Sequence, residues 1–583
     1  MALLRTATLL VTAALACGSP PPEIEDSDGG SSSTSDVVVG DHGHLTDAGD
    51  NLCERGKTRC AGGEVIETCG DSGLEWVAAP CPWNMECVVC TRADPSCDQD
   101  RCRPPCEEHY GLGSVGCTFI TSRQEHRASD APDAVVVANG RSLGSATVEF
   151  YRVADGTSEE VLVESVSLGP RESRTVLIDT AVIPGSTTQL ASGGVTRVSS
   201  DTPIIAFQHS PYRSHVDSSS SLLLPDRGLG RTYVVPSHRP FATGETLPSY
   251  FEVIALHKDT SVVWTSPVAT AGQGAKVPPA APGETVVQRE LNRYDRIRVA
   301  ALADDGSGGD LSGTVIRASN PVRVVAGSGC ARDEPAEGPC DSLQEGLIPV
   351  SHWATEYVAV HPPLQANEKH YWRVYAGDDD ITFVTKPQVL TPENCAEPAV
   401  FEDGECTLPT LGSWVEIEVP NGESFVVKGK RAPDDAVMVV GYLQSEPPDG
   451  ERGASPRATA MYPLIGTQQY LKRYAFQTPE GYDPPRPTET GAGNYIQVVR
   501  EQTSTTLFLD GEGVHGWEEV GEFEVATVRI AEGSHVVESN GDFGLLLFGF
   551  SGHDPQGCFE ENGGCASSYA YPGGLHESIV KLP

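Results

Sequence analysis

A short apolar segment recurs four times along this chain, at a spacing of about 115 residues. The four copies are Pro203–Phe207, Pro321–Val325, Ala436–Val440 and Leu545–Phe548. A loop and then a proline follow each copy, at Pro225, Pro349, Pro463 and Pro572. Recurrence at a fixed period indicates a repeated structural unit. An array of similar β modules more often displays surfaces than catalyses a reaction, so we expect a binding protein.

Each repeat begins with two strand-like runs that we interpret as a hairpin. The pairs are 134–138 with 146–150, 251–255 with 261–264, 371–375 with 381–384, and 495–499 with 506–509. A run of alternating polar and apolar residues follows at 296–299, 415–419 and 523–525, which predicts antiparallel strands with one buried and one solvated face. An aromatic residue follows the repeated proline at Tyr233, Tyr357 and Tyr470.

These runs give about seven strands in roughly 110 residues, which is the scale of a β-sandwich. We therefore predict an all-β fold of tandem antiparallel modules, with a β-propeller as the alternative. The predicted modules span residues 118–232, 233–356, 357–469 and 470–583, and a small disulfide-rich module precedes them at 53–117.

The N-terminus has the pattern of a signal peptide over residues 1–16: one positive charge, an apolar run and small residues before Cys17. Ala14-Leu15-Ala16-Cys17 resembles the box of bacterial lipoproteins, in which the cysteine carries the lipid. Resemblance to Gram-negative lipoproteins implies the outer membrane or cell surface, since Gly18 rather than Asp follows the cysteine. Secretion after ordinary signal cleavage is the alternative.

Cysteine usage points to an oxidising compartment. Of 17 cysteines, 16 remain when Cys17 is set aside, an even number that suits disulfides. Ten of them lie between Cys53 and Cys117, and the other six form three close pairs: Cys330/Cys340, Cys395/Cys406 and Cys558/Cys565. Zinc half-sites at Cys87/Cys90 and Cys102/Cys106 are the alternative within the N-terminal module.

Residues 17–52 hold the anchor cysteine and an acidic linker rich in Pro and Ser, which cannot bury enough surface to fold. The whole chain has 41 Lys and Arg against 81 Asp and Glu, a formal net charge of -40. Such a surface repels nucleic acid, so we expect no nucleic-acid partner. Membrane contact would depend on the lipid of Cys17 alone.

Catalytic motifs are absent from the sequence. It has no G-x-S-x-G elbow, no H-E-x-x-H and no G-x-x-x-x-G-K-[ST], so we expect no enzymatic activity. We expect no resident metal or cofactor, although the loop 304–310, with three aspartates among glycines, has a composition that calcium accepts. Asp378, Asp379 and Asp380 are interpreted as a turn.

The loops after the apolar segments are the candidate binding surface. Disulfides within Cys330/Cys340 and Cys558/Cys565 would stiffen two of these loops and reduce the entropy lost on binding. Tyr212, Arg213 and His215 occupy the corresponding first loop and are candidates for contact with a glycan or protein. Trp353, after the second proline, is interpreted as a core residue.

The segment Ser319–Cys330 and the segment Cys340–Trp353 resemble the hallmark of the IgGFc-binding protein N-terminal domain family. The family pattern is S-x-x-P-V-x-V-x-x-G-x-x-C followed by C-D-x-L-x-E-x-x-P-P-V-x-x-W-G. Here Ile348 replaces the first proline of the pair and Ala354 replaces the usual glycine. The closing segment 567–574 also resembles the family, so the resemblance covers about residues 117–583.

The resemblance implies a surface lipoprotein that displays this domain behind a cysteine-rich stalk. Fold and family determine the scaffold, whereas the loops determine the partner. The leading hypothesis is therefore an extracytoplasmic adhesion or binding protein that recognises an extracellular protein or glycan. The alternatives are a structural protein of the cell envelope or matrix and an enzyme that degrades an extracellular polymer.

Overall fold

The structure of the chain is a computed structural model. It describes residues 53–62, 65–72, 74–80, 86–88, 101–103, 106, 113–125, 131–141, 144–184, 187–212, 218–240, 247–302, 309–331, 341–363, 369–419, 422–443, 459–482, 492–502, 506–550 and 567–576. Within these residues all regular structure is β-strand apart from three single turns of 3₁₀ helix, so the all-β expectation is confirmed.

The N-terminal module contains a three-stranded sheet and a separate two-stranded ribbon. The sheet is formed by β1 (Thr58–Gly62), β2 (Val65–Cys69) and β3 (Trp76–Pro80), and the ribbon by β4 (Glu86–Val88) and β5 (Arg101–Arg103). Disulfides join Cys53 to Cys69 and Cys106 to Cys117. Because Cys106 pairs with Cys117, the proposed zinc half-site at Cys102/Cys106 is wrong.

Four units of similar topology follow this module, and we number them in chain order. Unit 1 contains β6 (Gly116–Thr121), β7 (Asp133–Ala138), β8 (Ala146–Val153), β9 (Glu160–Leu168), β10 (Ser173–Ile178), β11 (Gln189–Ser192), β12 (Val195–Ser210) and β13 (Ser219–Leu223). Unit 2 contains β14 (Thr232–Val234), β15 (Ser249–Ala255), β16 (Thr260–Thr265), β17 (Thr285–Leu291), β18 (Asp295–Ala300), β19 (Val315–Ala318), β20 (Val322–Ala331) and β21 (Asp341–Gly346).

Units 3 and 4 complete the array. Unit 3 contains β22 (Glu356–Ala359), β23 (His370–Ala376), β24 (Ile381–Lys386), β25 (Val400–Glu402), β26 (Glu405–Leu408), β27 (Trp414–Val419), β28 (Phe425–Gly429), β29 (Val437–Tyr442) and β30 (Met461–Pro463). Unit 4 contains β31 (Leu471–Gln477), β32 (Gly493–Glu501), β33 (Leu507–Leu509), β34 (Glu512–Gly513), β35 (Glu518–Val520), β36 (Phe523–Ile530), β37 (Ser534–Phe550) and β38 (Ser568–Pro572). The 3₁₀ turns η1 (Asp226–Gly228), η2 (Val350–His352) and η3 (Thr467–Gln469) lie between successive units.

Unit 2 shows the architecture most clearly, as two antiparallel sheets that enclose an apolar core. One sheet has the order β14-β19-β16-β17, and the other has β18-β15-β20-β21, to which β11 of unit 1 adds an edge strand. Phe251 of the second sheet packs edge-on against Trp264 of the first, with ring centroids 6.0 Å apart. The repeat is therefore a sandwich and not a pair of propeller blades.

The strands interpreted as hairpins do not pair with each other. β15 bonds to β18 and β20, whereas the next strand, β16, bonds to β17 and β19 in the opposite sheet. In unit 3 the equivalent strands β23 and β24 also belong to different sheets, whereas in units 1 and 4 the long strands β12 and β37 lie between the two equivalent strands and bond to both. The hairpin interpretation was wrong because a tight turn also occurs where a chain crosses between two packed sheets, and local sequence does not distinguish the two cases.

One predicted solvated face is also buried. In β18 the alternating residues Arg296 and Arg298 have no exposed surface, because unit 1 covers that face of the sheet. Arg296 donates from Nε to the carbonyl of Gly193 at 2.7 Å, and Arg298 donates to Gln124 at 2.8 Å. The alternation identified an antiparallel strand correctly, but the polar residues face a neighbouring unit and not water.

A buried tyrosine repeats the same pair of hydrogen bonds in three units. The hydroxyl of Tyr357 accepts the backbone N–H of Ala354 at 2.8 Å and donates to the carbonyl of Val437, at the start of the recurring strand, at 2.7 Å. Tyr233 and Tyr474 make the equivalent bonds in units 2 and 4. The fourth-unit counterpart is therefore Tyr474, and the assignment of Tyr470 was wrong.

The four repeated prolines occupy two different positions. Pro225 and Pro349 directly precede η1 and η2; Pro225 packs against Gly116 of β6, and Pro349 against Gly230, which lies two residues before β14. A Cβ on Gly116 would lie 2.4 Å from Cβ of Pro225, so only glycine fits there. Pro463 and Pro572 instead lie within the strands β30 and β38, where each is paired with a residue of the recurring strand.

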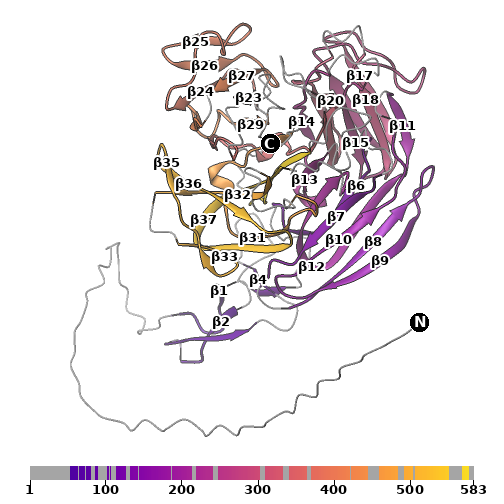
Figure 1. Cartoon of the computed structure of the whole chain (residues 1–583). Helices are drawn as coiled ribbons and strands as arrows, with labels where there is room; N and C mark the ends of the chain where they lie inside the picture. The colour runs from indigo at the N-terminus through magenta and orange to yellow at the C-terminus, as the bar shows by residue number, and fades with distance from the viewer. Residues whose placement is uncertain are drawn as a thin grey trace, which may run out of the picture.

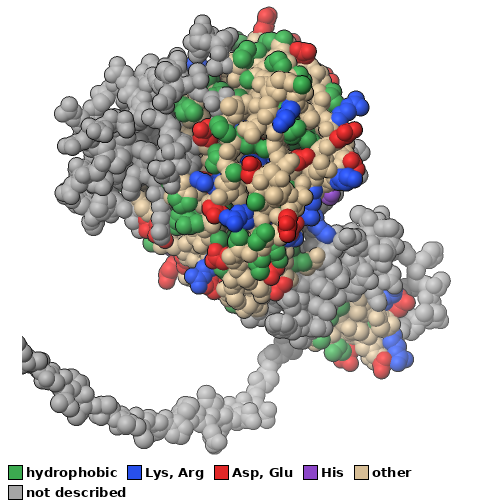
Figure 2. All heavy atoms as spheres, turned by 90° about the vertical axis from the view of Figure 1, so that its right-hand side faces the viewer, with side chains coloured by type: hydrophobic (Ala, Val, Ile, Leu, Met, Phe, Trp, Pro, Cys, Tyr) green, Lys and Arg blue, Asp and Glu red, His purple; other side chains and the backbone are tan. Residues whose placement is uncertain are grey.

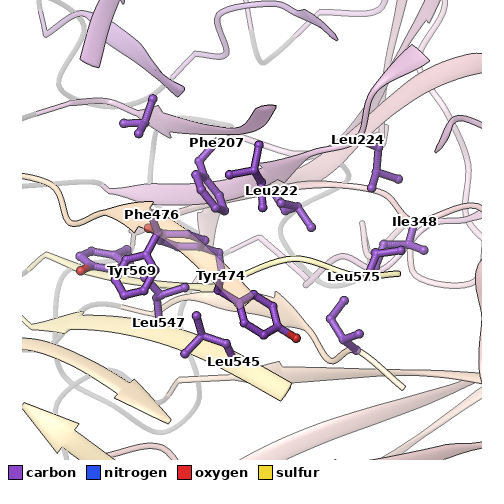
Figure 3. Close-up of a cluster of buried hydrophobic side chains, with 14 of the residues drawn as sticks. Phe207, Leu222, Leu224, Ile348, Tyr474, Phe476, Leu545, Leu547, Tyr569 and Leu575 are labelled. Atoms are coloured by element: carbon purple, nitrogen blue, oxygen red, sulfur yellow. The ribbon is translucent and has the colours of Figure 1, made fainter. Parts of the chain in front are cut away.

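The four units close into a ring around a shared core, which we call the hub. In Figure 1 the strands of successive units follow one another around a common centre. Strand β13 lies beside β21, β21 beside β30, β30 beside β38, and β38 beside β13. Figure 3 shows side chains of the hub, among them Phe207 and Leu222 of unit 1 and Leu545, Leu547 and Tyr569 of unit 4.

The first and last described segments of the array close the ring at the seam between units 4 and 1. Gly113 forms a β-bridge with His576, and Ser114 exchanges hydrogen bonds with Leu575. The rings of Phe207 and Tyr571 pack with centroids 5.2 Å apart. The seam is thus held by backbone and apolar contacts between the two ends of the repeat array.

The remaining junctions use one equivalent position on the second strand of each unit. Glu252, Arg373 and Gln497 each lie opposite the recurring strand of their own unit. Glu252 accepts from Ser122 of unit 1 at 2.6 Å. Arg373 donates to the carbonyl of Ser237 of unit 2 at 2.8 Å, and Gln497 to that of His361 of unit 3 at 2.7 Å. Each unit therefore contacts the preceding one through a buried polar group.

We predict that Tyr357→Phe lowers the free energy of unfolding by about 1–3 kcal/mol, because two buried backbone groups lose their partner. Tyr462→Phe is the matched control. Tyr462 is equally buried, and its hydroxyl has no hydrogen-bond partner among the described residues, so its removal should cost less than about 0.5 kcal/mol. Chemical denaturation of the two variants measures the difference, and equal losses would contradict the role assigned to the Tyr357 hydroxyl.

Candidate functional site

The recurring strand and the strand after it form a hairpin in every unit, and the four hairpins surround the hub. The pairs are β12 with β13, β20 with β21, β29 with β30, and β37 with β38. The connecting loops 213–217, 332–340, 444–458 and 551–566 are the loops predicted to bind, and they fall outside the described residues. The described ends of the hairpins nevertheless show where these loops attach.

Neighbouring hairpins point the same way. Ser219 Oγ donates to the carbonyl of Ser342 at 2.9 Å, and Ser221 Oγ to that of Gln344 at 3.4 Å, so β13 and β21 run side by side in the same direction. At the seam Phe207 contacts Tyr571 while His209 contacts Tyr569, which gives β38 the same direction as β13. The loops of units 1, 2 and 4 therefore attach at one end of the ring.

The ends of the hairpins of units 1 and 4 are underlain by an aromatic cluster. The ring of His209 lies 5.7 Å from that of Tyr571 and 6.2 Å from that of Tyr212, and Tyr482 packs edge-on against Tyr569 at 4.8 Å. The Tyr569 hydroxyl donates to Asn494 Oδ1 at 2.6 Å. This packing fixes the ends of two hairpins against each other, and it creates a rigid base for the loops above.

His209 is a buried imidazole in this cluster. Its Nδ1 lies 2.6 Å from Ser220 Oγ, and its Nε2 has no hydrogen-bond partner within the described part of the chain. Burial lowers the pKa of His209 to about 3, since no counter-charge offsets the lost hydration. The imidazole is therefore neutral at physiological pH and acts as a packing group.

The hairpin of unit 2 carries a buried pair of opposite charges. Arg323 and Glu345 are 2% and 1% exposed and lie on β20 and β21. Burial raises the pKa of the Glu345 carboxyl and lowers the pKa of Arg323 to about 10, while each charge partly stabilises the other. Ser221 of unit 1 donates from Oγ to the carbonyl of Gln344, and the same Oγ accepts the N–H of Gly346 at 3.2 Å, which ties this hairpin to its neighbour.

The predicted disulfide residues have different positions. Cys395 and Cys406 form a disulfide within unit 3, where Cys406 belongs to β26 and both sulfurs are buried in the unit's own core. Cys330, at the end of β20, is disulfide-bonded. Cys17, Cys340, Cys558 and Cys565 belong to segments that the structure does not describe. The bridge in unit 3 lies outside the four hairpins, because Cys406 belongs to β26 and the hairpin of that unit is β29 with β30.

Other candidate residues are engaged in the fold. Tyr212 is buried against His209, so its predicted contact with a ligand is wrong, while Arg213 and His215 are not described. Trp353 is buried and donates from Nε1 to the carbonyl of Ile348 at 3.1 Å, which confirms its place in the core.

Asp310 is the described end of the loop 304–310, whose composition suits calcium, and it has a structural role. Burial acts to raise the pKa of Asp310, but the charge of Arg373, 2.9 Å away across the junction of units 2 and 3, lowers the pKa overall. Asp304 and Asp305 are not described. Asp379 accepts the backbone N–H of Leu411 at 2.9 Å and belongs to a turn, as interpreted. The described residues contain no group of three or more metal-ligand side chains.

One face of the outer wall of the ring carries a mixture of side-chain types on its described part. Figure 2 shows the face that lies to the right in Figure 1, where acidic and basic side chains alternate with scattered hydrophobic ones on the described part of the surface. None of the described segments forms a helix that is long and apolar enough to cross a membrane. The hairpin end of the ring remains the candidate functional site.

Comparison with known proteins identifies the family of this chain. The family described as IgGFc binding protein matches residues 219–549, from β13 of unit 1 to the end of β37 in unit 4. This chain belongs to that family. Its relatives include the human IgGFc-binding protein, which is 26% identical over 341 residues. The match covers 57% of this chain and 5% of the human protein, so the two share one domain-sized region.

We predict a pH dependence of stability that originates in His209. Its pKa is about 3 in the folded chain and about 6.5 when unfolded, so between these values the unfolded chain binds one more proton. The free energy of unfolding therefore rises with pH across this window, by up to about 1.4 kcal/mol per pH unit.

The variant His209→Asn should remove the contribution of this proton, so the slope should fall by up to about 1.4 kcal/mol per pH unit between about pH 4 and pH 6. Asparagine keeps a polar atom near Ser220, and His515→Asn, at an exposed histidine, is the control. Denaturant unfolding at a series of pH values measures the slope. An unchanged slope in His209→Asn would show that the imidazole titrates normally in the folded chain.

Proposed function

We propose that this chain is an extracytoplasmic binding protein that recognises a protein or glycan through the hairpin end of its ring. The observation that supports the proposal most strongly is the convergence of the hairpins around one hub, in which the loops of units 1, 2 and 4 attach at the same end of the ring. A surface assembled from several loops on a rigid scaffold is a common arrangement for recognition. Membership of a family named for binding of the IgG Fc region agrees with a binding role.

The proposed ligand class is broader than the one in the family name. The human relative is named for IgG Fc, but the match covers 5% of that protein, and the loops that would select a ligand vary independently of the scaffold. We therefore propose an extracellular protein or glycan and no nucleic acid, because the net charge of -40 opposes polyanions. We assign the chain no catalytic activity. A structural role in the cell envelope is the second candidate.

We also propose that the chain is held at the outer membrane by a lipid on Cys17. The acidic linker and the N-terminal module would then separate the ring from the membrane, and the Cys106–Cys117 disulfide would connect this module firmly to β6. A lipid anchor predicts that the wild-type chain fractionates with membranes of a Gram-negative host and that Cys17→Ser moves it to the soluble fraction. Membrane fractionation that is unaffected by Cys17→Ser would eliminate the anchor.

Binding is tested with the full oxidised chain carrying Cys17→Ser on an array of glycans, mucins, peptidoglycan, matrix proteins and immunoglobulin. We expect saturable binding to one ligand class. A double substitution of Cys330 and Cys340 by serine should weaken binding by at least about tenfold, because a loosened loop loses more entropy on binding.

The matched control removes a disulfide that lies outside the four hairpins, with Cys395 and Cys406 both changed to serine. This variant should bind like the parent chain once its folding is verified by far-UV circular dichroism. Equal loss in both variants would assign the effect to general destabilisation. No binding across the whole array, with and without calcium, would favour the structural role.

A further inference from the structure

The outer wall of unit 1 includes a strand with one open edge. Strand β9 is the last in the order β10-β7-β12-β8-β9, and among the described residues it pairs with β8 alone. Figure 1 shows it on the outside of the ring. Backbone N–H and C=O groups of such an edge strand point away from the sheet, so they can pair with another extended chain. This edge is distinct from the hairpin end, because β9 belongs to none of the four hairpins.

Three consecutive apolar side chains are exposed on this strand, and we call them the apolar run. Val161, Leu162 and Val163 are 49%, 50% and 52% exposed. The other large apolar side chains that are exposed in the described part of the chain stand singly in the sequence. Because successive residues of a strand point to opposite faces, the edge is accessible from both faces of the sheet. Exposed runs of this kind are avoided in folded proteins unless a partner covers them.

Contacts at both ends hold β9 in place. Near its end, Leu168 is buried in the core of unit 1 and Val166 packs against that core. At its start, one carboxylate oxygen of Glu160 lies 3.0 Å from Nη1 of Arg197, and the other lies 3.1 Å from Nη2 of Arg293 in unit 2. An extended edge that is formed in advance costs little conformational entropy when a partner strand pairs with it.

Carboxylates flank the apolar run on both sides. Glu159 and Glu164 are exposed, and the sequence has no Lys or Arg between Ala154 and Pro170. Glu160 already pairs with two arginines, so the open charges beside the run are those of Glu159 and Glu164. Opposite charges on paired strands stabilise a sheet. Charge complementarity therefore favours a partner strand that carries Lys or Arg at both ends of a short apolar stretch.

A second copy of this chain fits the edge less well than such a segment. Antiparallel pairing of two β9 strands centred on Leu162 would place Glu160 opposite Glu164 of the second copy, and like charges in opposite positions destabilise a sheet. The register with β8 also shifts between Phe150 and Tyr151, where β9 carries one extra residue. A bulge of this kind increases the local twist and opposes long, regular pairing, so a short segment is favoured over a whole second strand.

We propose that the open edge of β9 binds an extended protein segment in which a short apolar stretch lies between basic residues. The segment would add a strand to the sheet of unit 1, with its apolar side chains beside the apolar run and its basic side chains beside Glu159 and Glu164. In this mode of recognition, backbone pairing supplies affinity and the side chains supply specificity. The inference goes beyond the proposed function, because it adds a protein partner at a strand edge that is not part of the hairpins.

The test is calorimetric titration of the full oxidised chain carrying Cys17→Ser with the peptide acetyl-Lys-Val-Thr-Val-Thr-Val-Lys-amide. We expect saturable binding with Kd of about 100 μM. The same peptide N-methylated at all its internal residues keeps its charge but loses its backbone donors, so it should bind at least about tenfold more weakly. A peptide with Glu in place of both Lys residues should also bind at least about tenfold more weakly, because it meets the carboxylates of the edge.

Leu162→Lys tests where the peptide binds. The substitution puts a positive charge into the apolar run, so it should weaken binding by at least about tenfold. Leu177→Lys is the matched control: Leu177 is 57% exposed on β10, at the opposite edge of the same sheet, where Arg174 does not favour a basic partner. This control should bind like the parent chain. Both side chains are exposed, so both variants should keep the parent's melting temperature.

The inference is overturned if the peptide does not bind up to about 2 mM, if the N-methylated peptide binds as tightly, or if Leu162→Lys binds like Leu177→Lys. It is also overturned if the parent chain forms dimers that Leu162→Lys separates in sedimentation velocity, because the edge would then belong to a second copy. Failure on the ligand array leaves this titration unaffected, so the two proposals are judged separately.

Discussion

The shared apolar hub is the constraint on which the rest of this structure depends. Each sandwich of units 1, 2 and 3 has a core between its own sheets, but the core of unit 4 is continuous with the hub. Residues such as Val136, Ile348, Val440 and Leu547 come from all four units and are buried together. Separating one unit from the ring would expose its part of this apolar surface, at a free-energy cost of about 25 cal/mol per Å². Burial of the hub therefore stabilises the closed ring and holds the hairpins against one another.

The fold class could be predicted from the sequence because its signals are local. Recurring apolar strands, alternation and turn residues depend on neighbours a few positions apart. The sheet that a strand joins is not determined by near neighbours. The sequence therefore predicts a hairpin of β15 and β16 although the two strands belong to opposite sheets. Arg296 and Arg298 looked solvated for the same reason, since only the placement of unit 1 buries them. Tyr470 and Tyr474 are four residues apart, and the sequence does not show which of the two hydroxyls bonds to the backbone near the recurring strand.

The sequence predicts the candidate site only in outline. The position of the loops after the recurring strands followed from the repeat itself, but their assembly at one end of the ring depends on contacts between units. His209 and Tyr569 are far apart in the chain and meet only at the seam. Asp226 and Arg293 are likewise far apart in the chain and line one cavity at the junction of units 1 and 2, which no spacing pattern in the sequence marks in advance.

The account depends on closure of the ring between units 4 and 1, and a double-mutant cycle on Phe207 and Tyr571 measures it most directly. Their rings pack at 5.2 Å although the residues belong to the first and last units. With Phe207→Leu, Tyr571→Leu and the double variant, a closed ring predicts a coupling free energy of about 1 kcal/mol. Additive effects within about 0.3 kcal/mol would show that the end units do not touch and would contradict the closed ring.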